Sequence, residues 1–157
     1  MFLLKGASIH MKVEKINESD HSDWQQLYCG YADFYKMPMD QKTLDTVWSW
    51  IFDEKIEFYA IVARGDDGKS LGFMHFRQMP SPLRGVMVGF LDDLYVYPDA
   101  RGSGAVQALF KELKVIAKDR GWPFIRWITA SDNQRARAVY DKISNTIDFV
   151  TYQMLTK

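Results

Sequence analysis

The order of the elements predicted for residues 90–140 constrains the fold of this chain more than any other feature. A β-rich run is followed by a glycine-containing turn, a long helical pattern, a second β-rich run and a short helical pattern. A strand, a crossover helix and a second buried strand make a parallel βαβ unit. Glycines where the first strand meets the helix let backbone N–H groups approach an anion at the positive end of the helix dipole. We therefore expect an anion site at residues 101–105.

The sequence of this turn narrows the choice of anion. A P-loop would end in Gly-Lys-Ser/Thr, and a dinucleotide-binding fold would have a third glycine near Gln107 and an acidic residue after the next strand. The run Arg101-Gly102-Ser103-Gly104 fits neither pattern. An α/β nucleotide-binding domain is therefore disfavoured.

The turn resembles the acetyl-CoA pyrophosphate loop of the GNAT superfamily of N-acetyltransferases, whose pattern is Gln/Arg-x-x-Gly-x-Gly/Ala. Arg101 and Gly104 match this pattern, and the last position is Val106, which keeps its N–H group. The resemblance implies that acetyl-CoA is the co-substrate and that its pantetheine amides pair with the backbone of Leu94, Tyr95 and Val96. It also implies a pyrophosphate site made by Arg101, Gly102, Ser103, Gly104, Ala105 and Val106.

A second motif of the same superfamily follows further along the chain. Asn133-x-x-Ala136-x-x-x-Tyr140 resembles the signature in which the asparagine contacts the pantetheine arm and the tyrosine stands near the sulfur of CoA. Helical spacing places Ala136, Val139, Tyr140 and Ile143 on one face, so Tyr140 is expected to point inward. A tyrosine taken alone is more often a core aromatic with a hydrogen-bonded hydroxyl. Two motifs in the right order favour the functional interpretation.

The resemblance covers roughly residues 72–152 and implies an α/β (α+β) fold. We expect a mixed, mostly antiparallel central sheet of six to seven strands, with a parallel splayed pair in the middle and about four helices on both faces. The hydrophobic pattern adds helices near Trp24, Asp40 and Val106. It predicts strands at residues 11–16, 58–64, 71–79, 86–97, 124–130 and 146–155. In the family the strand at 86–97 is bulged and splayed, and Gly89 is a candidate for close approach there.

Length and composition bound the rest of the interpretation. The 157 residues suit a single domain, with residues 1–10 as a possible extension before an alternative start at Met11. Equal counts of basic and acidic residues, 20 each, argue against a nucleic-acid partner. The single cysteine, Cys29, favours a reducing, cytoplasmic location. The three histidines are far apart in the sequence and lack the spacing of metal ligands, so no metal site is expected. No apolar run is long enough for a membrane span. The β-rich C-terminus and the family's habit suggest a homodimer.

Acetyl transfer from a thioester to an amine sets three requirements. The amine must lose a proton, the tetrahedral oxyanion needs a donor, and the departing thiolate benefits from an acid. Tyr140 is the candidate acid, and a backbone N–H near Leu94 is the candidate oxyanion donor. Asp92 and Asp93 are the candidates for the base. Adjacent residues of a regular strand face opposite ways, so only one should meet the amine. The alternative is a bulge or edge position with the carboxylate in water.

The tract Phe-Leu-Asp-Asp-Leu-Tyr-Val resembles a tract of the spermidine/spermine acetyltransferases and of the yeast histone/polyamine acetyltransferase group. The resemblance implies that Asp92 is a base acting through water and that Asp93 holds a cationic acceptor or braces the strand. We expect an N-acetyltransferase for a small cationic amine, such as a polyamine, a diamine or a lysine analogue. A non-catalytic acyl-CoA-binding regulatory domain and a protein or peptide lysine acetyltransferase remain as alternatives.

Overall fold

The computed structural model describes residues 10–157. The chain forms two compact units, the first reaching to Trp127 and the second spanning Ile128–Lys157. The extension expected at residues 1–10 lies, except for its last residue, outside the described part. The expectation that the whole chain is one domain stays a prediction.

The first unit contains a mixed sheet of five strands in the order β1-β2-β3-β4-β5. Neighbouring strands are antiparallel except β4 and β5, which are parallel. The α/β fold class predicted from the sequence is confirmed. The strands are β1 (Lys12–Lys15), β2 (Phe58–Arg64), β3 (Ser70–Ser81), β4 (Val86–Val96) and β5 (Ile125–Arg126).

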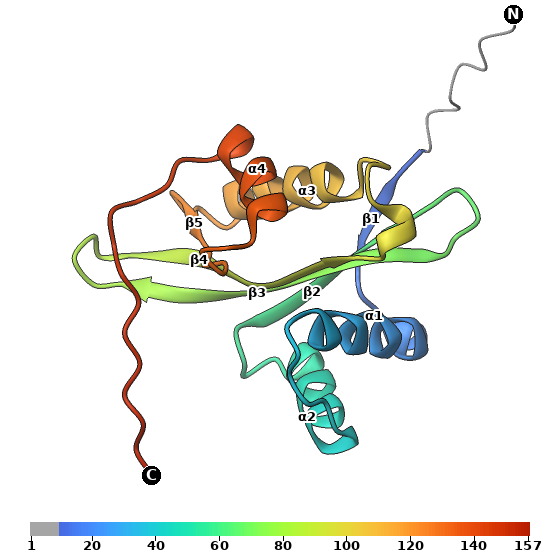
Figure 1. Cartoon of the computed structure of the whole chain (residues 1–157). Helices are drawn as coiled ribbons and strands as arrows, with labels where there is room; N and C mark the ends of the chain where they lie inside the picture. Colours follow the sequence, from blue (N-terminus) through green and yellow to red (C-terminus); the bar gives the residue numbers. More distant parts are fainter. Residues whose placement is uncertain (1–9) are drawn as a thin grey trace, which may run out of the picture. The chain divides into compact units, whose positions relative to one another are not determined.

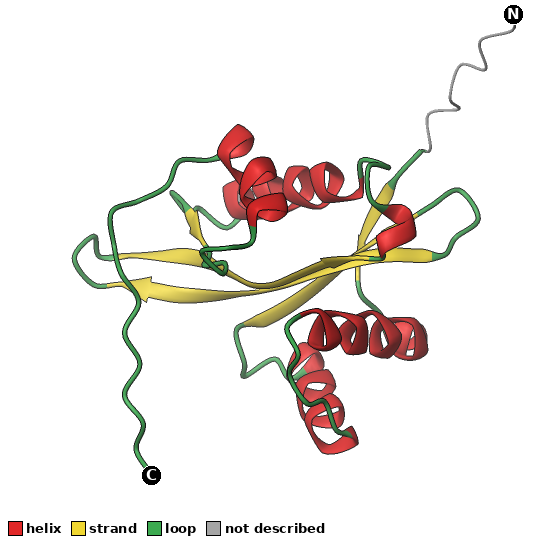
Figure 2. Cartoon of the chain, in the orientation of Figure 1, coloured by secondary structure: helices red, strands yellow, loops and turns green. Residues whose placement is uncertain are grey.

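The expected count of six to seven strands is wrong, and the parallel pair lies at the edge of the described sheet instead of its middle. The strand expected at 124–130 pairs over only two residues, and residues 146–155 contain no strand. Figure 2 shows the chain after the last helix as a loop. Phe149, Tyr152 and Leu155 are exposed there. Residues with high β-propensity pack well on the surface of a sheet. A strand also needs a neighbouring strand to pair with, and composition does not show whether one is present.

Helices cover both faces of the sheet in the first unit (Figure 1). The side chains of Ile61 and Ala63 pack with α3 (Ala105–Asp119), whereas those of Ala60 and Val62 pack with α1 (His21–Phe34) and α2 (Gln41–Phe52). This division follows from the two-residue period of a strand, since successive side chains point to opposite faces. The sheet therefore separates two cores, one under α3 and one under α1 and α2.

Capping residues fix where the helices begin and end. Asn17 caps the short 3-10 helix η1 (Glu18–Asp20), which leads directly into α1. The Asp40 carboxylate accepts a hydrogen bond of 2.8 Å from the N–H of Thr43 and starts α2, the helix predicted near Asp40. Gly121, with φ of 72°, follows α3 and ends it. A second 3-10 helix, η2 (Pro98–Ala100), connects β4 to the glycine turn before α3.

The second unit contains one helix, α4 (Gln134–Ile143), and the loop that follows it. Asn133 is its N-cap, because the side-chain Oδ1 accepts a hydrogen bond of 3.3 Å from the N–H of Ala136. Among the described helices of both units, none is long and apolar enough to cross a bilayer.

Candidate active site

A β-bulge in β4 determines the geometry of the acidic pair. His75 pairs with Asp93 and Phe76 pairs with Leu91, so Asp92 is an extra residue with no partner in the ladder. An extra residue bends the strand and changes the direction of the side chains beside it. The expectation that Asp92 and Asp93 face opposite ways was wrong for this reason. Both residues line the same pocket.

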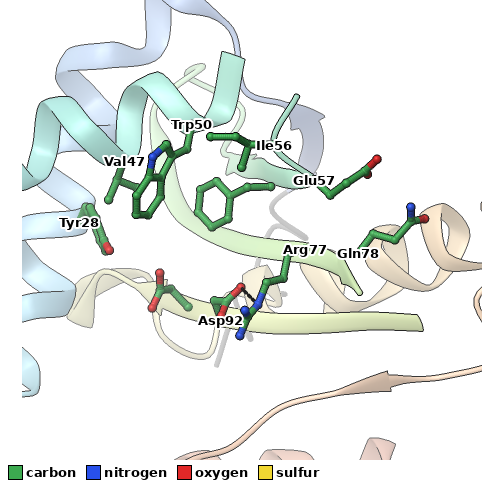
Figure 3. Close-up of a pocket in the computed structure, with 10 residues that line it drawn as sticks. Tyr28, Val47, Trp50, Ile56, Glu57, Arg77, Gln78 and Asp92 are labelled. Carbon is green, nitrogen blue, oxygen red and sulfur yellow. Dashed lines mark ion pairs between the residues drawn. The ribbon is translucent and has the colours of Figure 1, made fainter. Parts of the chain in front are cut away.

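This pocket has a volume of about 660 Å³ and lies on the face of the sheet covered by α1 and α2. Figure 3 shows Trp50 and Ile56 on one side and Arg77 and Asp92 on the other. Both of these helices contribute to the lining. The lining residues are Tyr28, Val47, Trp50, Ile56, Glu57, Phe58, Arg77, Gln78, Asp92 and Asp93.

The carboxyl group of Asp92 is only partly compensated. Arg77 Nε lies 3.1 Å from Asp92 Oδ2 as an ion pair, but the alignment is not that of a hydrogen bond, and this buried oxygen has no hydrogen-bond partner among residues 10–157. Burial raises the pKa of Asp92 to about 6, against the lowering effect of Arg77 and with a further increase from Asp93. A carboxylate with this pKa is a proton acceptor suited to neutral pH.

Asp93 is held by a chain of buried hydrogen bonds. Its Oδ2 lies 2.8 Å from Nδ1 of His75, and Nε2 of His75 lies 2.8 Å from Nε1 of Trp24. An indole N–H can only donate, so Nε2 of His75 must accept and the ring proton must sit on Nδ1, facing Asp93. His75 and Trp24 are fully buried. The Asp93 carboxylate is therefore fixed in position by a neutral histidine.

The sequence interpretation did not assign a role to this histidine. His75 was considered only as a metal ligand, for which its spacing is unsuitable, and Trp24 only as part of a helical hydrophobic pattern. A histidine inside the apolar run of β3 was the available signal. Its pairing with Asp93 across the bulge depends on the register of β3 and β4, which the sequence pattern does not fix.

Two tyrosines of α1, Tyr28 and Tyr31, lie near Asp93, and Tyr28 also lines the pocket. Burial, and then the negative charge of Asp93, raise the pKa of Tyr28 and of Tyr31 above the usual value. Both hydroxyls therefore remain protonated at neutral pH and can donate hydrogen bonds. The rings of both tyrosines pack against Phe73, while their hydroxyl groups lie near Asp93.

The second half of β4 has an open edge. On one side Leu94, Tyr95 and Val96 pair with β3. On the other side β5 pairs only with Gly89 and Phe90, so among residues 10–127 no strand lies along that edge of β4 after Phe90. The family resemblance implied such a splayed edge. Gly89 does allow a close approach, since a Cβ there would lie 2.6 Å from the Trp122 ring.

The glycine turn before α3 exposes a group of backbone donors. Gly102 and Gly104 have φ values of 77° and 91°, which favour glycine. The N–H groups of Arg101 and Ser103 donate within the turn. Among the described residues no backbone acceptor is found for the remaining four predicted donors, as expected at a helix start. These four belong to Gly102, Gly104, Ala105 and Val106.

Two side chains of this turn could affect whether an anion reaches these backbone donors. Val106 packs against the core under α3, so its side chain does not cover the donors. Ser103 Oγ is buried and has no hydrogen-bond partner in the described part of the chain. Neither observation obstructs an anion at this helix start.

The remaining predicted site residues lie in the second unit. Asn133 caps α4 and its Nδ2 lies 3.4 Å from Thr129 Oγ1. Ala136 and Tyr140 are half-buried, whereas Ile143 is exposed. The predicted face of α4 is thus partly protected from solvent. The roles expected for Asn133, Ala136 and Tyr140 stay predictions.

Comparison with known proteins adds independent findings. The sequence model described as the acetyltransferase (GNAT) family matches residues 23–144. The D-amino-acid N-acetyltransferase HPA3 of Saccharomyces cerevisiae is 27% identical over 142 residues, which are 90% of this chain and 88% of that protein. The thialysine N-ε-acetyltransferase of Caenorhabditis elegans is 35% identical over 60 residues, covering 38% and 35% of the two chains.

A solved structure gives the same result for the fold. Aminoglycoside N-acetyltransferase AAC(6')-Iy in complex with CoA superposes with a TM-score of 0.82, covering 98% of this chain and 100% of that one. The sequence identity is 16%, so the likeness concerns the fold alone.

Proposed function

Because the chain belongs to the GNAT family of acetyltransferases, we propose that it transfers the acetyl group of acetyl-CoA to a small primary amine bound in the pocket beside Asp92. The family makes the chain an acyltransferase, and relatives named as N-acetyltransferases agree with that. The observation that carries the proposal is Asp92 itself: a partly buried, incompletely paired carboxyl group in a bulge that lines a pocket.

The open edge of β4 and the glycine turn are the proposed acetyl-CoA site. The N–H groups of Gly102, Gly104, Ala105 and Val106 are candidates for the pyrophosphate, at the positive end of the α3 dipole. Ser103 belongs to the same proposed site, and its buried Oγ, which has no hydrogen-bond partner among the described residues, would have to turn outward to reach the anion. The backbone of residues 94–96 is the proposed partner of the pantetheine amides. For Asn133 and Ala136 a contact with the pantetheine arm stays the expectation from the family motif.

Asp92 is proposed to prepare the amine. A free amine of this kind has a pKa of about 10 and arrives as an ammonium, which has no lone pair. Asp92 accepts the proton, through a water molecule because its side chain is short. The amine nitrogen then attacks the thioester carbonyl, and the sulfur leaves as a thiolate. Tyr140 is the proposed donor of the proton that the thiolate takes up. The nitrogen carries an extra proton after its attack, and this second proton passes to the Tyr140 phenolate, so that the products are the amide, the CoA thiol and the proton held by Asp92.

Asp93 is proposed to orient the substrate instead of taking its proton. His75 occupies one of its oxygens, and the two tyrosine hydroxyls are close by. A fixed carboxylate next to the base favours an ammonium over an anionic acceptor. The acceptor class is therefore a small cationic amine, which includes polyamines, diamines and lysine analogues. One relative is named for thialysine, which is a lysine analogue, and the other is named for D-amino acids, whose amino group is likewise an ammonium.

Two further expectations belong to the same proposal. A cytoplasmic location rests on the single cysteine, Cys29. A homodimer rests on the apolar residues of the C-terminal stretch, which are exposed in the single chain. Light scattering on the purified protein would measure the oligomeric state.

Release of the CoA thiol over a panel of amines tests the function. We expect amine-dependent release with the native chain, and product of the mass of an N-acetylated amine. Tyr140→Phe should lower kcat by about 100-fold or more, because an acid is removed, while CoA affinity stays nearly unchanged. Binding of CoA without release for any amine would instead favour a regulatory acyl-CoA-binding domain.

A further inference from the structure

Arg77 is the positively charged residue of the pocket lining, and most of its donors are unused. It comes from β3 opposite Phe90, and its guanidinium lies 4.8 Å from the centre of the Phe90 ring. Its ion pair with Asp92 uses Nε. The side chain is 48% exposed, and among residues 10–157 no carboxylate lies against its terminal nitrogens. A guanidinium has five N–H donors, so the two terminal groups are available to a ligand.

An ion pair with Asp92 does not account for this arginine. The guanidinium end of the pair is half-exposed, which weakens the attraction, and the contact lacks hydrogen-bond alignment. A guanidinium binds a carboxylate best through two parallel N–H groups, and the terminal groups offer that geometry. The free side of Arg77 therefore matches a carboxylate supplied by the substrate.

The charges in the pocket are arranged as the complement of an amino acid. Asp92 and Asp93 are adjacent on the bulge, and Arg77 contacts the first of them. An α-amino acid carries its ammonium and its carboxylate on one carbon atom, so both can meet these groups at once. Glu57, the third acidic residue of the lining, already accepts a hydrogen bond from Tyr59. A second ammonium, as in a polyamine, would meet Arg77 and be repelled.

The opposite wall of the pocket is apolar. Trp50 is 41% exposed and lies edge-on to Phe58, with 6.0 Å between the ring centres. Val47 and Ile56 extend the same wall (Figure 3). Small-molecule sites commonly combine an aromatic or apolar wall with a few placed charges. An apolar side chain on the acceptor would cover Trp50.

We propose that the acceptor is an α-amino acid with an apolar side chain, its ammonium on Asp92 and Asp93, its carboxylate on Arg77 and its side chain against Trp50 and Phe58. This rests on the proposed function and narrows its acceptor class. Arg77 is then a specificity-determining residue, because it binds the carboxylate of the acceptor, which takes no part in the reaction.

A matched pair of acceptors tests the role of Arg77. Phenylalanine and phenylalaninol differ only by the replacement of the carboxylate with a hydroxymethyl group, and both enantiomers of each would be assayed. We expect the native chain to prefer phenylalanine in kcat/KM. Arg77→Gln should lower kcat/KM for phenylalanine by about 10- to 100-fold, the effect of losing charged hydrogen bonds. For phenylalaninol the loss should be about tenfold smaller, because this acceptor has no carboxylate and loses only the effect of Arg77 on Asp92.

Arg84→Gln is the control, since Arg84 lies outside the lining and contacts Ser81 and the Phe124 ring. This variant should leave kcat/KM unchanged for both acceptors. Equal losses for both acceptors in Arg77→Gln would mean that Arg77 only positions Asp92, and this would overturn the proposal. A native preference for phenylalaninol or spermidine would do the same.

Equilibrium binding separates this proposal from the proposed function. Titration of each acceptor into the CoA-saturated protein measures affinity without chemistry. If no amine is acetylated, the proposed function fails, whereas phenylalanine binding that is lost in Arg77→Gln would still support the amino-acid site. Absence of phenylalanine binding to the native protein would overturn it.

Discussion

Asp92 and Asp93 are neighbours in the sequence, yet their carboxyl groups have different surroundings. Asp92 has a buried oxygen without a hydrogen bond, whereas Asp93 receives one from His75. Environments of this kind separate two carboxylates into different roles. The proposed division, with Asp92 accepting a proton and Asp93 holding the ammonium, follows from this difference and not from their order in the chain.

The raised pKa of Asp92 has a consequence for stability. Its folded pKa of about 6 lies above the usual 3.8, so protonation favours the folded state. That contribution is complete below about pH 4 and is lost as the pH rises through 6. Asp92→Asn should therefore have a higher free energy of unfolding than the native chain at pH 8, and the difference should shrink towards pH 4. Urea unfolding at both pH values measures this, and a pH-independent difference would contradict it.

The hydrogen bond from Trp24 to His75 can be tested by removing the indole N–H. Trp24→Phe keeps most of the packing but leaves Nε2 of His75 buried and unpaired, which should cost about 1–3 kcal/mol of stability. It should also raise KM for the acceptor, because His75 no longer fixes Asp93.

Trp48→Phe is the matched control for that variant. Trp48 packs against Trp24, with 4.9 Å between the ring centres, and has no hydrogen bond to His75. It should leave KM unchanged. Nitrogen NMR of the native protein should place the His75 proton on Nδ1, and a proton on Nε2 would refute the arrangement.

At the scale of elements, the glycine turn and the bulge in β4 carry the site. The turn was predictable, because two glycines between a strand and a helix have a specific backbone use. The helix caps at Asp40 and Gly121 were predictable for similar local reasons. The bulge was expected from the family resemblance, but a bulge position for the Asp92/Asp93 pair was considered only as the alternative to a role in the site. The position of the bulge depends on which residues of β3 face β4, and this register is a tertiary property.

Gly104 provides a test of the turn. It starts α3 with φ of 91°, so Gly104→Ala should cost about 1–2 kcal/mol of stability. It should also weaken CoA binding, because the donors of the turn move. Gly68→Ala is the control, since Gly68 has φ of 79° in the turn between β2 and β3 and likewise has open space around it. The control should lose similar stability but no CoA affinity. Calorimetric titration measures the affinity for CoA. Equal losses of CoA affinity in the two variants would show that the turn before α3 is not part of the CoA site.

At the scale of the whole molecule, local patterns predicted more than the long-range arrangement. The two cores on either side of the sheet follow from the alternation in β2 and from the amphipathic helices. The predicted strand count was too high partly because of the C-terminal stretch. Apolar and polar residues alternate around Phe149, a pattern that suits a strand but does not require one. The histidine that holds Asp93 also escaped prediction, since its partners Trp24 and Asp93 are distant in the sequence.

The pH dependence of amine-driven thiol release, measured for the native chain and for Asp92→Asn, tests the central claim most directly. With Asp92 as the base, native kcat/KM should fall about tenfold per pH unit below 6. In Asp92→Asn the rate should be about 100-fold lower at pH 8, and that acidic limb should be absent. A variant with the native rate and the native pH profile would show that Asp92 does not take the proton.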